Sequence, residues 1–146
     1  MIKRIHHVAI AVENLDESAA CWGEGGIGLP EEGREHVASQ RTTVAMFPVG
    51  ESRVELVAAS DPTSPIARHL SKRGPGIHHL CFEVDDLRAE MARLKAAGLR
   101  FTSDEPTPGA HGSLVAFVHP KSTGGVLLEL NEFPGQRASH DPPEPT

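Results

Sequence analysis

An internal duplication is the feature that most constrains how this sequence can fold. The segment IHHVAIAVENLDESAA, which starts at Ile5, lies without a gap over IHHLCFEVDDLRAEMA, which starts at Ile77. Two later strings, VAMFP and GESRVELV, match VAFVHP and GGVLLELN in the same order and at nearly the same offset. Because three separate segments agree, the chain consists of two related modules joined by a linker.

Each module has the pattern of one strand, one helix and then three strands. In module one, Asn14 with Glu17 makes a capping-box-like start for an amphipathic helix that ends near residue 23. Alternating β-branched residues predict its strands at 5–12, 32–37, 41–48 and 52–59. In module two, Asp85 or Asp86 caps a helix that ends near Gly98. Its predicted strands are 77–84, 99–102, 113–119 and 125–131. The sequence therefore predicts an α+β fold of tandem βαβββ modules.

The segment between the modules predicts a short helix. In TSPIARHLSKRG, Ser64 is a candidate N-cap, Pro65 takes the first helical position and Gly74 ends the helix. We expect one domain over 1–146, with module one at about 1–60, the linker helix at about 63–74 and module two at about 75–133. The proline-rich, polar segment 134–146 is expected to be a disordered tail outside the chemistry.

Composition excludes several functional classes. With 146 residues, 38% hydrophobic and 23% charged, the chain resembles one globular domain, and no apolar run is long enough to span a membrane. A net charge of −6 without a Lys/Arg cluster argues against a nucleic-acid partner. Cys21 and Cys81 are the only cysteines and form no disulfide framework, so a cytoplasmic protein is expected.

Strand phase separates the two histidines of each HH pair. Side chains alternate across a strand, so His7 shares a face with small residues that leave room for a cavity. His6 is expected on the opposite face, with larger apolar side chains beneath the helix. The same alternation places His79 on the open face and His78 in the packed set. We therefore expect His7 and His79 to be available as ligands, and His6 and His78 to be packing or supporting residues.

Each module also has a carboxylate inside an apolar strand, Glu55 in RVELV and Glu129 in LLELN. An unpaired buried carboxylate is costly, so each should lie beside a cation or a strong hydrogen-bond donor. Together with His7 and His79, the two carboxylates suit one first-row divalent ion such as Zn, Co, Ni or Mn. The alternative is a structural His–Glu pair that the duplication copied.

The chain also resembles a known family. Its duplicated pattern is similar to that of the vicinal oxygen chelate superfamily, which includes glyoxalase I. Four strings within residues 5–131 resemble the methylmalonyl-CoA epimerase family: IHHVAIAVENLDES, TSPIARHLSKRGPGIHHLCFEVDDL, GLRFTSDEPTPGAHG and VAFVHPKSTGGVLLEL. The resemblance implies a curved mixed sheet around a metal, commonly in a homodimer. The implied metal ligands are His7, Glu55, His79 and Glu129, and some family members have Gln at the position of Glu55.

The implied reaction interconverts the two C2 epimers of methylmalonyl-CoA, an acyl-CoA substrate, by proton transfer through an enolate. Glu129 is expected to be one proton carrier. Several epimerases carry another Glu on the strand before the second ligand, where this chain has Val44. His111 of the GAHG string is the candidate replacement, unless it is simply an exposed loop residue. Glu55 or a bound water is the alternative carrier for the second face. The CoA portion is expected in an open groove, with Lys121 either touching it or lying on the surface.

Two other functions remain open at this point. A lactoylglutathione lyase of the glyoxalase I type would use the same four ligands. A non-catalytic binding protein could share the fold. An extradiol-type dioxygenase is disfavoured, because its metal needs two His and one carboxylate with open positions, whereas Glu55 supplies a fourth ligand.

Overall fold

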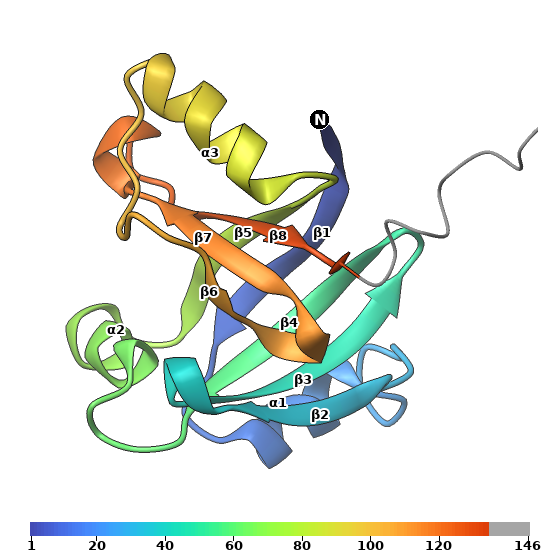
Figure 1. The fold of residues 1–146 in the computed structure, drawn as a ribbon. Helices are drawn as coiled ribbons and strands as arrows, with labels where there is room; N and C mark the ends of the chain where they lie inside the picture. Colours follow the sequence, from blue (N-terminus) through green and yellow to red (C-terminus); the bar gives the residue numbers. More distant parts are fainter. Residues whose placement is uncertain (135–146) are drawn as a thin grey trace, which may run out of the picture.

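The computed structural model describes residues 1–134, which form two modules and a linker helix (Figure 1). Module one contains β1 (Ile2–Ala11), α1 (Leu15–Trp22), β2 (Gly33–Val37), β3 (Thr42–Val49) and β4 (Ser52–Ala59). The linker helix is α2 (Pro65–Arg73). Module two contains β5 (Gly76–Val84), α3 (Leu87–Ala96), β6 (Thr107–Pro108), β7 (Leu114–Val118) and β8 (Leu128–Glu132). The predicted tail lies outside the described residues except for its first residue.

All eight strands belong to one mixed sheet with the order β2-β3-β4-β1-β5-β8-β7-β6. The two first strands, β1 and β5, pair antiparallel at its centre, and each has the last strand of its own module as a parallel neighbour. The sheet curls, with α1 and α3 on its outer side and α2 beside β5 (Figure 1). This arrangement confirms the predicted fold class and makes the β1–β5 pairing the only strand contact between the modules among residues 1–134.

Local capping explains where the helices begin. The side chain of Asn14 accepts a hydrogen bond from the backbone N–H of Glu17, and Asp86 accepts one from Ala89. Ser64 caps α2 by accepting from the N–H of Ile66, with Pro65 in the first turn as predicted. Each cap satisfies a backbone donor that the helix itself leaves unpaired.

Equivalent residues build the cores of the two modules. Leu56 of β4 and Leu130 of β8 are both fully buried. Leu56 packs in a cluster with Ala19 of α1, and Leu130 packs with Met91 of α3. A separate cluster of Ala9, Ala11, Val57 and Ile66 lies on the inner side of module one, against α2. No helix in the described part of the chain is long and apolar enough to cross a bilayer.

The prediction of a strand at 99–102 is wrong. Phe101 makes only an isolated bridge to Val118, and the second strand of module two is the two-residue β6. β6 is short because Pro106 and Pro108, on either side of Thr107, have no N–H to donate to a ladder. The last strand also begins at Leu128 rather than 125.

Candidate metal centre

Two neighbouring rows across the sheet hold the four candidate metal ligands. One row crosses β4, β1 and β5 and consists of Glu55, Ala9 and His79. The other crosses β8, β5 and β1 and consists of Glu129, Cys81 and His7. Residues in register on adjacent strands project from the same face, so each row directs one Glu and one His to the inner side of the curl. The small middle residues, Ala9 and Cys81, are equivalent in the two modules and leave room between the ligands.

Three of the four side chains meet closely. Nε2 of His7 lies 3.1 Å from Nε2 of His79. Oε2 of Glu129 lies 2.8 Å from Nε2 of His79 and 3.8 Å from Nε2 of His7. These three groups lie within 4.8 Å of one another. Glu55 is more distant, with Oε1 at 3.7 Å from Nε2 of His7. The structure thus brings all four residues together and places Glu55 at the edge of the group.

The expectation for His6 and His78 is wrong in its geometry. The register of β1 against β5 shifts between Ile5 and His7, and again between Ala9 and Ile10. His6 is the extra residue of the first irregularity, and His78 of β5 is the extra residue of the second. A β-bulge interrupts side-chain alternation, so both histidines of a pair can turn to the same side. His6 lines the inner pocket together with His7, and His78 lines a neighbouring cavity together with His79.

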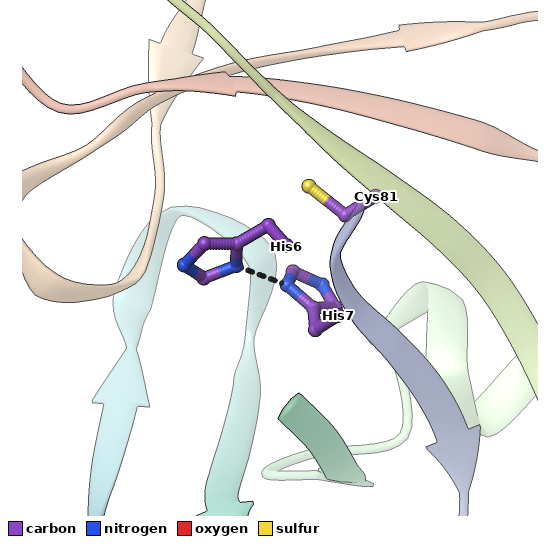
Figure 2. Close-up of side chains that lie close together, drawn as sticks. All are labelled: His6, His7 and Cys81. Carbon is purple, nitrogen blue, oxygen red and sulfur yellow. Dashed lines mark hydrogen bonds between the residues drawn. The ribbon is translucent and has the colours of Figure 1, made fainter. Parts of the chain in front are cut away.

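Each bulged histidine contacts the ring of the candidate ligand that follows it. Nδ1 of His6 lies 2.7 Å from Nδ1 of His7, and Nδ1 of His78 lies 2.8 Å from Nδ1 of His79. Figure 2 shows the rings of His6 and His7 joined by this contact, with the sulfur of Cys81 above them in the view. We expected His6 and His78 either to pack or to support the metal ligands. Contacts between ring nitrogens correspond to the supporting role.

The donor set fits a cation. Burial lowers the pKa of His6, and it lowers the pKa values of His7 and His78 to about 3, so these rings are neutral at pH 7. A neutral imidazole that donates from Nδ1 has a lone pair on Nε2. If His7 and His79 donate to their neighbours, two Nε2 lone pairs and a carboxylate oxygen converge with no proton between them. A divalent ion removes that repulsion and is bound by these same ligand types.

The two carboxylates differ in their electrostatics. Burial raises the pKa of Glu55 well above its ordinary value, and the carboxylates of Glu129 and Glu35 add to the effect. Burial also opposes ionisation of Glu129, but positive charge and a hydrogen bond from His79, with contributions from His7 and Cys81, outweigh burial and lower the pKa to about 2. This effect requires a proton on Nε2 of His79, which a bound cation would replace. Burial likewise raises the pKa of the Cys81 thiol, so the thiol is protonated at pH 7 while no cation is bound to it.

An inner pocket is lined by three of the four candidate ligands, His7, Glu55 and Glu129, and also by His111. His111 therefore lies at the site rather than on a remote loop. Its backbone has a positive φ of 56°. Its N–H donates to Oε2 of Glu35 at 2.7 Å, and its Nδ1 lies 3.5 Å from the same oxygen.

Glu35 and Asn131 are site residues that the sequence did not reveal. Glu35 is the cross-strand partner of Val44, which is buried and lines the inner pocket. A carboxylate is thus present beside the position where the sequence has lost one, although on the neighbouring strand. Asn131 lines the same pocket, and its buried Oδ1 accepts no hydrogen bond within residues 1–134. Such an acceptor is suited to a donor group that enters the pocket.

Known proteins share this sequence and fold. The family model described as the glyoxalase/bleomycin resistance protein/dioxygenase superfamily matches residues 6–117. The ethylmalonyl-CoA/methylmalonyl-CoA epimerase of Cereibacter sphaeroides is 41% identical, over 90% of this chain and 99% of that protein.

Two solved structures have the same architecture. The methylmalonyl-CoA epimerase of Mycobacterium tuberculosis has a TM-score of 0.85 at 36% identity, covering 90% of this chain and 88% of that one. The Streptomyces coelicolor epimerase, in complex with 2-nitronate-propionyl-CoA, has a TM-score of 0.86 at 31% identity, covering 90% and 95%. The chain therefore belongs to the glyoxalase/bleomycin resistance protein/dioxygenase superfamily and, within it, to the family of the methylmalonyl-CoA epimerases.

Proposed function

We propose that this protein is a metal-dependent epimerase that interconverts (2R)- and (2S)-methylmalonyl-CoA. The observation that carries the proposal is the inner pocket, where two groups able to carry a proton, Glu129 and His111, line one small space beside the convergent ligands. The names of the relatives agree with this reaction, and the Streptomyces enzyme holds an acyl-CoA analogue.

The reaction needs charge stabilisation and two proton carriers. C2 of the substrate lies between a carboxylate and a thioester, and loss of its proton gives a planar enolate. A divalent ion held by His7, Glu55, His79 and Glu129 would stabilise the negative charge that develops on the substrate oxygens. Because inversion requires proton exchange on both faces of the plane, two groups on opposite sides are needed.

Glu129 is the first proton carrier in this proposal. Both of its imidazole contacts involve Oε2, so neither imidazole engages Oε1. The carboxylate thus has one oxygen directed at the ligand group and another that can accept the C2 proton. Its position in the middle of β8, beside fully buried Leu130, holds it in place.

His111 is the second proton carrier. Glu35 holds the backbone of His111 through its N–H and lies near Nδ1, an arrangement that orients the ring and leaves Nε2 for the substrate. The oriented ring would accept a proton at Nε2 on one face of the enolate plane and return a proton on that face in the reverse direction. Glu35 would therefore be a positioning residue for His111.

Incorporation of solvent deuterium tests the proposal. Incubated with a divalent metal and one epimer of methylmalonyl-CoA in D₂O, the protein should introduce deuterium at C2 and produce the other epimer. A metal-loaded preparation that exchanges nothing would rule the epimerase out. Parallel assay with the hemithioacetal of methylglyoxal and glutathione identifies a lactoylglutathione lyase. Inactivity with both substrates would contradict both of these enzymatic activities, and a purified protein without metal would then favour a binding protein.

The remaining parts of the proposal are the metal, the assembly and the location. We infer that the ion is one of Zn, Co, Ni or Mn, because the donors are two imidazoles and two carboxylates. We also infer a homodimer that acts in the cytoplasm, by analogy with the family. Metal analysis of the purified protein and light scattering coupled to gel filtration measure the first two, and fluorescence of a tagged chain in cells tests the third.

A further inference from the structure

The two modules differ at the residue two positions after the candidate carboxylate ligand. In module one this residue is Val57, after Glu55, and in module two it is Asn131, after Glu129. Because side chains alternate along a strand, each projects to the inner side of the sheet together with its carboxylate. Both residues are only 2% exposed. Module two therefore buries an amide where module one buries an apolar side chain.

Val57 and Asn131 line different cavities. Val57 and His78 line a cavity of about 400 Å³, which borders the surface cleft lined by the cations of α2. Asn131 and His6 line the inner pocket, whose volume is about 20 Å³. One water molecule needs roughly 10–15 Å³ and at least two polar partners. The inner pocket thus has room for one water, beside side chains that can hydrogen-bond to it.

The amide oxygen of Asn131 needs a hydrogen-bond donor. Its Oδ1 is buried and accepts no hydrogen bond from residues 1–134. Ser113 also lines the inner pocket, but its hydroxyl donates to the carbonyl of Ala110 at 2.7 Å. A buried acceptor without a donor has given up its hydrogen bonds to water and gained none in return, which destabilises the folded chain. The donor should therefore come from a molecule in the pocket.

The ring of His6 has one nitrogen without a partner in the protein. Its Nδ1 lies 2.7 Å from Nδ1 of His7, and its ring lies against that of Phe133, with the centroids 5.1 Å apart. Nε2 is on the edge of the ring away from His7 (Figure 2). No residue of the described chain forms a hydrogen bond with this nitrogen. A neutral imidazole can donate from Nε2 or accept there, depending on its tautomer.

The role expected for His7 decides the tautomer of His6. To bind a cation through Nε2, neutral His7 must carry its proton on Nδ1. Because that Nδ1–H then donates to Nδ1 of His6, neutral His6 carries its own proton on Nε2. The Nε2–H of His6 in turn needs an acceptor, and the Oδ1 of Asn131 needs a donor. One water between them would satisfy both groups.

We propose that the inner pocket binds one water molecule, which accepts a hydrogen bond from Nε2 of His6 and donates one to Oδ1 of Asn131. This water stabilises the tautomer of His6 that accepts from His7, and so directs the Nε2 lone pair of His7 toward the ion. Asn131 is thus a positioning residue that acts on His7 through the water and His6. The water and the tautomers are independent of the proposed reaction, and only their use in binding a cation rests on the proposed function.

The second histidine pair lacks this arrangement. The ring of His78 contacts that of His69, with the centroids 4.8 Å apart, and the cavity beside it is lined by Val57. A proton on Nε2 of His79 can donate to Oε2 of Glu129, 2.8 Å away. The His78–His79 pair is therefore an internal control, because a change at Asn131 should not affect its tautomers.

Nuclear magnetic resonance of the metal-free protein tests the tautomers. With ¹⁵N-labelled histidine, long-range correlation spectra show which ring nitrogens carry protons. In the wild type, Nε2 of His6 and Nδ1 of His7 should be protonated. Asn131→Val, which introduces the residue of module one, should move the protons to Nδ1 of His6 and Nε2 of His7 in a detectable share of the molecules. The signals of His78 and His79 should not change. Wild-type tautomers in Asn131→Val would overturn the positioning role.

Asn131→Thr is the matched variant for Asn131→Val. Threonine has the shape of valine and adds one hydroxyl oxygen that can bind the water, so Asn131→Thr should recover the wild-type tautomers at least in part. A crystal structure of the wild type should show a water within hydrogen-bonding distance of Oδ1 of Asn131 and of Nε2 of His6. A pocket without that water would overturn the proposal even if Asn131→Val does not fold.

Zinc affinity, measured by competition with a metal-binding dye, separates this proposal from the proposed function. It should fall roughly fivefold in Asn131→Val, because the support of one ligand is lost, and recover in part in Asn131→Thr. Unchanged affinity with altered tautomers would overturn the use of the water in metal binding. A wild-type protein that has the water and the predicted tautomers but binds no zinc would support the water site and overturn the metal dependence of the proposed function.

Discussion

In module two, the imidazole of His79 lies 2.8 Å from Glu129, whereas in module one His7 and Glu55 are 3.7 Å apart. The sheet positions are equivalent, since each Glu is in register with the small residue at the middle of its row. The environments differ, because Glu55 faces two other carboxylates, those of Glu129 and Glu35. Like charges disfavour ionisation of Glu55, while an imidazole favours ionisation of Glu129.

This difference shows how a duplicated site can divide its work. The half-site of module two is closed, with its carboxylate fixed beside its imidazole. The half-site of module one is looser, and Glu55 also borders the cavity that leads to the surface. We infer that the module-two pair anchors a bound ion and that Glu55 is its most exchangeable ligand.

The largest expected effect comes from removing the charge of Glu129. Glu129→Gln should lower the rate of C2 deuterium exchange roughly 10³-fold or more, because one residue loses both a ligand charge and a proton carrier. The matched variant Glu55→Gln should bind metal roughly tenfold more weakly and retain exchange when metal is in excess. Mass spectrometry of the substrate and metal content per chain measure the two effects. Equal losses of exchange in the two variants would show that the half-sites do not differ.

The scaffolds of the modules should be alike even though the half-sites are not. Leu56→Ala and Leu130→Ala each empty a fully buried position under the helix of one module, and each should lower the free energy of unfolding by about 2–5 kcal/mol. Urea denaturation with metal chelated measures this. Ile27→Ala, at a 59% exposed position, is the control and should have little effect. If only one of the two substitutions lowers the free energy of unfolding by this amount, the cores of the two modules are not packed alike.

Loss of His111 should stop proton exchange on one face of the planar enolate and leave exchange on the other face. His111→Ala should reduce epimerisation roughly 10²-fold, and one epimer should still exchange C2 hydrogen through Glu129 with retention of configuration. Chiral analysis of the deuterated products measures this. Glu35→Gln should have a smaller effect of the same kind, because it disturbs only the orientation of the imidazole. If His111→Ala exchanges the C2 hydrogen of both epimers at the normal rate, the second proton carrier is another group.

The smallest expected effect concerns the bulged histidines. His6→Leu and His78→Leu each remove the ring that contacts the Nδ1 of a candidate ligand, and each should weaken metal affinity roughly tenfold. His6→Asn and His78→Asn keep a hydrogen-bonding side chain and should recover part of the loss. Competition with a metal-binding dye measures both pairs. A loss confined to one histidine would show that only one half-site depends on such support.

Much of the fold was predictable because most elements occur in both modules, so two related segments of sequence predict the same helix or strand. The caps at Asn14 and Ser64 follow local rules, and the structure confirms them. The alternation in β4 is confirmed as well, since Leu56 and Val57 pack in clusters on opposite faces of the sheet. The proximity of His7, Glu55, His79 and Glu129 also follows from strand phase applied to two equivalent strands. Their role as metal ligands and the roles of Glu129 and His111 in proton transfer remain predictions.

Other features depend on contacts that a local pattern does not encode. The bulges at His6 and His78 arise where two distant strands pair, so alternation alone places these rings on the wrong face. Glu35 reaches His111 across 76 residues of sequence, from the edge strand of one module to a loop of the other. The cations of α2 are readable in the sequence, but the cleft that they line also needs residues of β5 and of the segment before β8.

The β1–β5 pairing has a consequence for assembly. Each row of ligands crosses this seam, so neither module alone carries more than one His and one Glu of the set. An ion that binds only when the seam is closed contributes its binding free energy to the docking of the modules, about 2.7 kcal/mol at a metal concentration one hundred times Kd. Occupancy of the site and closure of the seam are then one linked equilibrium, and metal availability becomes a determinant of how long the two halves stay together.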